Sequence, residues 1–97
     1  MAFVLTVRMT AKEGEEENVV AAFRELAPAS RAESGCLAYQ PHRAPDDARV
    51  FFVYEQYADE EAFKAHGESE HFQRYAAGDL FPRLESRERA FYETLDV

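Results

Sequence analysis

Alternating apolar and polar residues predict four β-strands in this chain. Residues 3–10 place an apolar side chain at every odd position, which is the period of a strand with one buried face. Residues 36–43, 49–57 and 87–95 alternate in a similar way. The strand at 49–57 is the most informative, because both of its faces are largely apolar and both must therefore be covered.

Between the first two strands, apolar residues recur at helical spacing. This pattern predicts a helix over residues 14–33, which begins at the acidic run 15–17, where the positive end of the helix dipole favours carboxylates. Pro28 is expected to kink this helix or to end its regular part, because proline lacks the N–H that a helix needs. Gly35 is expected to stop it.

Two shorter helical pieces follow the third strand. Asp59 is a good N-cap for the first piece, which should break near Gly67. Ser69 caps a second piece, and Pro82 ends or offsets it. The resulting order is β-α-β-β-α-β. We therefore expect an α+β, ferredoxin-like domain over residues 1–97, with a four-stranded antiparallel sheet and its helices on one face.

The predicted sheet has a second face that two helices cannot cover. Strand 49–57 would place large apolar side chains on that face, and soluble monomers rarely expose a large apolar patch. A second copy of the same sheet, related by a two-fold axis, is the simplest cover. The sequence thus predicts a homodimer that pairs through the open sheet face.

Charge and composition exclude several classes of partner. The formal net charge is −8 and no basic stripe is present, so we expect no nucleic-acid or membrane-surface partner. The single cysteine rules out an internal disulfide, which is typical of a reducing compartment. No apolar run is long enough to span a bilayer, and residues 1–10 do not form a signal peptide, since they lack a basic start. We expect a cytoplasmic protein.

Three stretches of the chain resemble the antibiotic biosynthesis monooxygenase domain family. They are Ser34–Tyr39, Phe52–Tyr57 and Ala65–Phe72. They look like the family stretches E-x-G-C-L-x-Y, F-x-x-Y-E-x-W and H-x-x-S-x-H-F, in the same order and at fitting separations. Tyr57 departs from the pattern, because many relatives have tryptophan at that place.

The resemblance implies a dimeric α/β barrel with a pocket between sheet and helices in each subunit. It also implies oxygenation of a quinol-like or polyketide-like aromatic small molecule by O₂, with no metal or organic cofactor. Two other functions stay open on the same fold: isomerisation of a small dicarbonyl compound, and non-catalytic small-molecule binding. The haem-degrading branch uses an Asn-Trp-His set. It does not fit, because the chain has no tryptophan and its only asparagine lies in the first predicted helix.

His66 and His71 are the candidate general bases. Oxygenation of this kind needs a base near neutral pKa, and histidine suits that role. The two residues are five apart, across the predicted helix break, so a break at Gly67 could bring both to one pocket wall. Alternatively, one packs in the core and the other caps its helix. The spacing differs from the i, i+4 pair of a zinc helix, and we expect no metal.

Glu55 is the third candidate, because it lies on an apolar face of the predicted strand 49–57. A buried carboxylate is either paired or has a raised pKa. It could accept a proton or orient a histidine, or it could form an ion pair, with Arg8 as one partner. Aromatic residues supply the candidate substrate-binding side chains, although most aromatics at such spacing are core. These candidates are Phe23, Tyr39, Phe52, Phe72 and Tyr75.

Overall fold

A four-stranded antiparallel sheet with helices on one face makes up the computed structural model, which describes residues 1–97. The strands lie in the order β2-β3-β1-β4. They are β1 (Phe3–Ala11), β2 (Cys36–Arg43), β3 (Val50–Tyr57) and β4 (Leu84–Glu93). The helices are α1 (Glu16–Arg31), α2 (Glu60–Glu68), the π-helix η1 (Phe72–Leu80) and the 3₁₀ turn η2 (Phe81–Arg83). The predicted ferredoxin-like α+β fold is confirmed.

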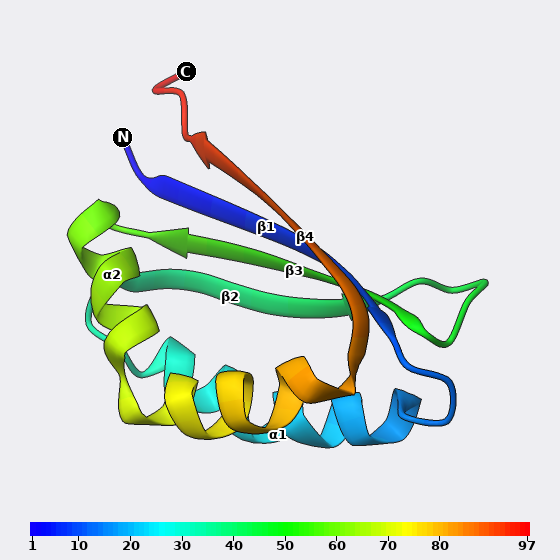
Figure 1. The fold of residues 1–97 in the computed structure, drawn as a ribbon. Helices are drawn as coiled ribbons and strands as arrows, with labels where there is room; N and C mark the ends of the chain where they lie inside the picture. The colour runs from blue at the N-terminus through cyan, green and yellow to red at the C-terminus, as the bar shows by residue number, and fades with distance from the viewer.

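Figure 1 shows how the layers are arranged. Helices α1 and η1 run side by side beneath the sheet, and α2 lies at one end of it. Strand β1 is central, because it pairs with both β3 and β4. The core consists mainly of the inward face of β1 and β3 and the apolar stripe of α1. Its largest inward side chains are Leu5, Val7, Met9, Phe23, Leu26, Phe51 and Val53.

Helix α1 passes through Pro28 and ends at Arg31. The regular helix does not end at Pro28, so that part of the expectation was wrong. Proline leaves the carbonyl four residues earlier, at Arg24, without its usual N–H partner. Both Pro28 and Arg24 are exposed, so water can satisfy that carbonyl, and the helix continues.

The two later helical pieces form with the predicted caps. The side chain of Asp59 accepts a hydrogen bond from the backbone N–H of Ala62 at 2.8 Å. The Ser69 Oγ accepts one from the backbone N–H of Phe72 at 3.2 Å. The first piece runs one residue past Gly67, and the second is a π-helix. Strand β4 begins at Leu84, earlier than predicted, because residue 84 pairs with Ala11 beyond an irregularity in β1.

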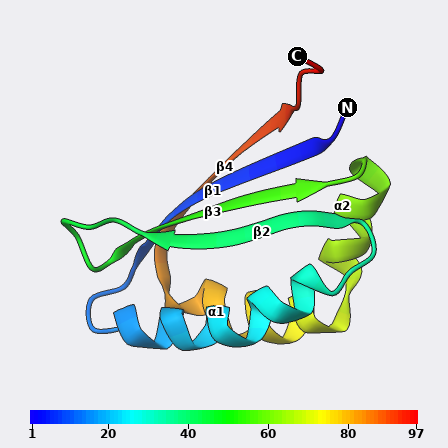
Figure 2. The same cartoon turned by 180° about the vertical axis from the view of Figure 1, so that it is seen from behind.

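The outer face of the sheet carries no helix, as Figure 2 shows from behind. Arg8, Phe52 and Tyr92 are on this face, since the pairing register places them opposite to the core residues. Phe52 is 38% exposed and Tyr92 is 57% exposed. No helix of the chain is long and apolar enough to cross a membrane. The cytoplasmic location stays a prediction.

Candidate active site

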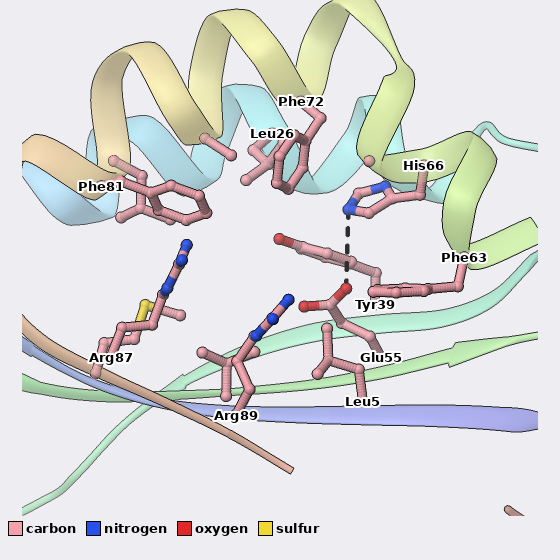
Figure 3. A pocket seen from close by; sticks show the side chains of 15 residues that line it. Leu5, Leu26, Tyr39, Glu55, Phe63, His66, Phe72, Phe81, Arg87 and Arg89 are labelled. Atoms are coloured by element: carbon pink, nitrogen blue, oxygen red, sulfur yellow. Dashed lines mark ion pairs between the residues drawn. The ribbon is translucent and has the colours of Figure 1, made fainter. Parts of the chain in front are cut away.

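A cavity of about 320 Å³ lies between the inward face of the sheet and helices α2, η1 and α1. Its walls are mostly apolar, and Figure 3 shows the side chains that converge on it. The apolar wall comprises Leu5, Val7, Met9, Leu26, Tyr39, Phe63, Phe72, Ala76, Leu80 and Phe81. Gly67 and four ionisable side chains complete the lining: Glu55, His66, Arg87 and Arg89. An apolar pocket with a few convergent polar groups is the usual form of a small-molecule site.

His66 is held in one orientation by Glu33. Its Nδ1 lies 2.7 Å from the Glu33 Oε2, and the same oxygen lies 2.5 Å from the Nε2 of His71. Because a carboxylate only accepts hydrogen bonds, Nδ1 of His66 carries the proton of the neutral ring. The other nitrogen, Nε2, is therefore the free acceptor, and it lies 3.8 Å from the Glu55 Oε1.

Burial determines the charge state of His66. The residue is 2% exposed. Desolvation lowers the pKa of its imidazole, and the nearby Glu33 carboxylate only partly opposes that effect. A lowered pKa keeps the imidazole neutral at pH 7. His66 is thus ready to accept a proton at Nε2 from a molecule in the cavity.

Burial shifts the pKa of Glu55 in the opposite direction. Desolvation raises its pKa from 4.5 to about 7, although a hydrogen bond from Tyr57 opposes the shift. The Tyr57 hydroxyl donates to the Glu55 Oε1 at 2.6 Å. Arg8, suggested as one partner of Glu55 in an ion pair, does not pair with it within the chain. Arg8 lies on the outer face, whereas Glu55 is opposite Leu5 on the inner face.

The Tyr39 hydroxyl makes no hydrogen bond within the chain, although the residue is only 4% exposed. Figure 3 shows its hydroxyl directed into the cavity. Desolvation raises the pKa of this phenol well above its ordinary value, so the hydroxyl stays protonated. Tyr39 therefore offers a hydrogen-bond donor to a bound molecule.

The structure brings some predicted site residues together and separates others. His66, Glu55, Tyr39 and Phe72 line the same cavity. His71 is not part of the cavity lining, and its Nε2 contacts the same Glu33 oxygen that holds His66. The other three candidates are elsewhere: Phe23 in the core, Phe52 on the outer face, and Tyr75 against the core outside the cavity lining.

Sequence reasoning missed Glu33 and the two arginines of the site. Glu33 directly precedes the stretch Ser34–Tyr39, and an acidic residue begins the family stretch that it resembles. That position was a usable signal. Arg87 and Arg89 alternate with outward residues on β4, but only the register shows that they lie opposite Met9 and Val7 and so face the cavity.

Glu33, His66 and His71 could also offer ligands to a metal ion, since one atom from each lies within 4.8 Å of the others. Two imidazoles and a carboxylate are a known zinc set. Two ligands of a tetrahedral zinc lie roughly 3.3 Å apart. The Glu33 oxygen is only 2.7 and 2.5 Å from the two nitrogens, which is hydrogen-bond geometry. A bound metal would therefore have to push these groups apart. The expectation that the site holds no metal stays a prediction.

Comparison with known proteins identifies a family and a set of similar folds. The family model described as antibiotic biosynthesis monooxygenase matches residues 2–78. The crystal structure of PA3566 from Pseudomonas aeruginosa is 32% identical to this chain, covers 97% of it and 94% of that protein, and has a TM-score of 0.89. No curated protein matches the chain.

Two further crystal structures share the fold. A protein of unknown function from Bacteroides thetaiotaomicron, described as a possible oxidoreductase, is 25% identical over 96% of this chain and 97% of that one, with a TM-score of 0.88. A Nitrosomonas europaea protein provisionally assigned to the antibiotic biosynthesis monooxygenases is 24% identical over 98% and 91%, with a TM-score of 0.91. Because the Nitrosomonas europaea protein is only 24% identical to this chain, its similarity concerns the fold alone.

Proposed function

Because the chain belongs to the antibiotic biosynthesis monooxygenase family, we propose that it is a cofactor-independent monooxygenase of quinol-like or polyketide-like aromatic molecules. One observation carries the proposal. A neutral imidazole, His66, lies on the wall of an apolar cavity with Nε2 free and Nδ1 held by Glu33. This is the arrangement of a general base whose tautomer is set by a carboxylate.

In the proposed mechanism, His66 Nε2 accepts the proton of a phenolic or enolic hydroxyl. The imidazolium that forms is stabilised by the Glu33 carboxylate at 2.7 Å. The substrate anion gains a hydrogen bond from the Tyr39 hydroxyl, which has no acceptor within the chain. A preorganised donor at a developing oxyanion lowers the barrier to its formation.

The anion is electron-rich and reacts with O₂ directly. The substrate supplies all four electrons, so no external reductant is required. A hydroquinone and O₂ give a hydroxybenzoquinone and water, with one oxygen atom in the product and the other in the water. Glu55, with a pKa of about 7, can return a proton to the departing oxygen.

Oxygen uptake by the metal-stripped protein tests this proposal. The substrates are a panel of benzo- and naphthohydroquinones, and autoxidation is subtracted. We expect His66→Gln to lower the rate by about 100-fold or more, which is the usual contribution of a general base. Glu33→Gln should also lower it, because the amide can donate to Nδ1 and thereby place the ring proton on Nε2. Treatment with a chelator should leave turnover unchanged.

His71→Gln and His42→Gln are the matched controls. His42 is exposed on the outer face, outside the cavity, so its loss should not matter. His71 contacts Glu33 but not the cavity, so its loss should have a smaller effect than that of His66. Full activity in His66→Gln would contradict the assigned base.

Isomerisation of a small dicarbonyl is the second candidate. The observation that favours it is the pair His66 and Glu55, two proton-transfer groups 3.8 Å apart in one cavity. Such a pair could take a proton from one carbon and return it to the next. Product formation without oxygen uptake would identify this reaction. Non-catalytic binding is less well supported, since the cavity is not filled by its own side chains and Glu55 has no arginine within ion-pair distance.

We also propose that two copies pair through the outer sheet face. The exposed Phe52 and Tyr92 support this assembly, as does the lack of a helix on that side of the sheet. The cavity of each copy lies on the opposite, helical side of its sheet.

A further inference from the structure

Two arginines enter the cavity from β4, and neither forms an ion pair, although the charge of Arg89 lowers the pKa of the nearby Glu55 carboxyl. Arg87 and Arg89 both line it, and Figure 3 shows their side chains directed into the space beneath Phe81 and Phe72. Neither guanidinium forms a hydrogen bond or an ion pair with another side chain, whereas those of Arg43, Arg49 and Arg83 each do.

Aromatic contacts hold the two guanidinium groups. The Cζ of Arg87 lies 3.7 Å from the centre of the Phe81 ring, and that of Arg89 lies 5.3 Å from the Phe91 ring. Stacking of this kind orients a guanidinium but leaves its N–H groups free. The planar N–H pairs are therefore available to a bound molecule.

The polar groups of the cavity are unbalanced in favour of donors. Arg87, Arg89 and the Tyr39 hydroxyl all donate, and none has an acceptor within the chain. The basic acceptors that face the cavity at neutral pH are Nε2 of His66 and the Glu55 carboxyl beside it, which is partly ionised because its pKa is about 7. A molecule that satisfies this lining has a hydroxyl for His66 and several acceptor oxygens for the arginines.

The pairing register gives the separation of these two ends. Along β1, Glu55 is opposite Leu5, Arg89 is opposite Val7, and Arg87 is opposite Met9. Each step of two residues advances about 7 Å along a strand. The backbone rows of Arg89 and Arg87 thus lie roughly 7 and 14 Å from the Glu55 row, a span of the order of two fused rings.

We propose that the substrate of this cavity is a hydroxylated polycyclic aromatic acid. Its hydroxyl lies against His66 and its anionic group is bound by Arg87 and Arg89. Arginine suits this role because its fork matches a carboxylate with two parallel hydrogen bonds. The inference rests on the proposed function for the role of His66, and it adds the class of substrate. The overall charge of −8 repels anions from most of the surface, so the two arginines form a local exception to it.

A matched pair of fluorescent probes tests the inference without any turnover. The probes are 6-hydroxy-2-naphthoate and its neutral amide, which differ in charge and have the hydroxyl and the acyl group at opposite ends of two fused rings. Affinity is measured by fluorescence titration under nitrogen. We expect the naphthoate to bind about tenfold or more tightly than the amide, as one charge-assisted hydrogen-bond pair provides. That preference should weaken as salt is added.

Substitutions at the two arginines complete the test. The double variant Arg87→Gln, Arg89→Gln should lose the preference, and the double Arg→Lys variant should retain much of it. Arg24→Gln is the control, because it removes one positive charge from the exposed face of α1, outside the cavity. Equal affinity for both probes in the wild type, failure of the naphthoate to bind at millimolar concentration, or a preference that survives in the double Gln variant would overturn the inference.

This experiment separates two kinds of failure. Because it needs no oxygen, the anion preference can be present in a protein that shows no oxygen uptake, and then only the proposed reaction is wrong. Conversely, neutral hydroquinones could be oxygenated at the same rate by the wild type and by the double Gln variant. In that case the proposed reaction would stand, and the proposal of an acidic substrate would be wrong.

Discussion

Glu55 and His66 show how a single environment sets two protonation states at once. Both side chains are almost fully buried, at 5% and 2% exposure. Burial disfavours the charged form of each, so it raises the pKa of the carboxyl and lowers that of the imidazole. The result is a site in which the carboxyl can still hold a proton at neutral pH while the imidazole is free to accept one.

The raised pKa of Glu55 has a measurable effect on stability. In the unfolded chain this carboxyl ionises near 4.5, and in the folded chain at about 7. The folded state therefore binds the extra proton between these values. The stabilisation is complete below pH 4.5 and is lost as pH rises through 7. The difference between 4.5 and about 7 corresponds to a loss on the order of 3 kcal/mol.

Glu55→Gln should remove this loss, because the amide cannot ionise and its oxygen can still accept from Tyr57. We expect the variant to gain stability relative to wild type as the pH is raised from 5 to 8, measured by urea denaturation at each pH. His66 is common to both proteins, so its own titration cancels in the comparison except for its interaction with Glu55 at 3.8 Å. Glu25→Gln, on the exposed face of α1, serves as the control. A constant difference between wild type and Glu55→Gln across this range would contradict the raised pKa.

At the scale of the elements, periodicity predicted the order of strands and helices and placed Glu55 and Phe52 on opposite faces of β3. It could not predict which residues of different elements meet. Glu33 reaches His66 because the turn after α1 lies against α2, and Arg89 reaches the cavity because of the β1–β4 register. Phe52 was misplaced for a related reason. Both faces of β3 are apolar, and alternation alone does not show which one the helices cover.

Gly35 is the place where α1, β2 and α2 are brought together. The backbone of Gly35 accepts a hydrogen bond from the Ala58 N–H at 2.9 Å, and a side-chain Cβ at this position would overlap the Cβ of Ala62 on α2. Glycine is thus required by close approach and not by a left-handed backbone, since Gly14 is the only residue with positive φ. The sequence predicted only that Gly35 ends the helix, and it did not predict this close contact with α2.

Gly35→Ala should destabilise the fold by about 1–3 kcal/mol, because the new methyl group overpacks the contact with α2. The same shift would move His66, which is on that helix, so activity should fall as well. Gly67→Ala is the control for stability only, because no atom lies near its added Cβ and alanine favours a helix, while Gly67 itself lines the cavity. The double variant Gly35→Ala, Ala62→Gly should recover most of the lost stability in thermal denaturation. No recovery would mean that the contact is not the cause.

At the scale of the whole molecule, the sheet divides the protein into a functional side and a bare side. All helices and the cavity lie on one side, and the other presents the outer residues of four strands to solvent. Strands spaced about 4.8 Å apart and eight to ten residues long give a face of roughly 20 by 30 Å. That is close to the area of about 800 Å² per partner that a stable pair of proteins buries.

We expect the wild-type chain to elute as a dimer in size-exclusion chromatography with light scattering, at twice its mass of 11.1 kDa. Phe52→Asp should shift it to the monomer, because pairing would then bury an unpaired carboxylate in each copy. Ala21→Asp adds the same charge on the exposed face of α1 and should leave the dimer intact. A far-ultraviolet spectrum equal to that of wild type would show that Phe52→Asp still folds. A monomeric wild type at micromolar concentration, or a Phe52→Asp variant that stays dimeric, would mean that the bare face is not where the copies meet.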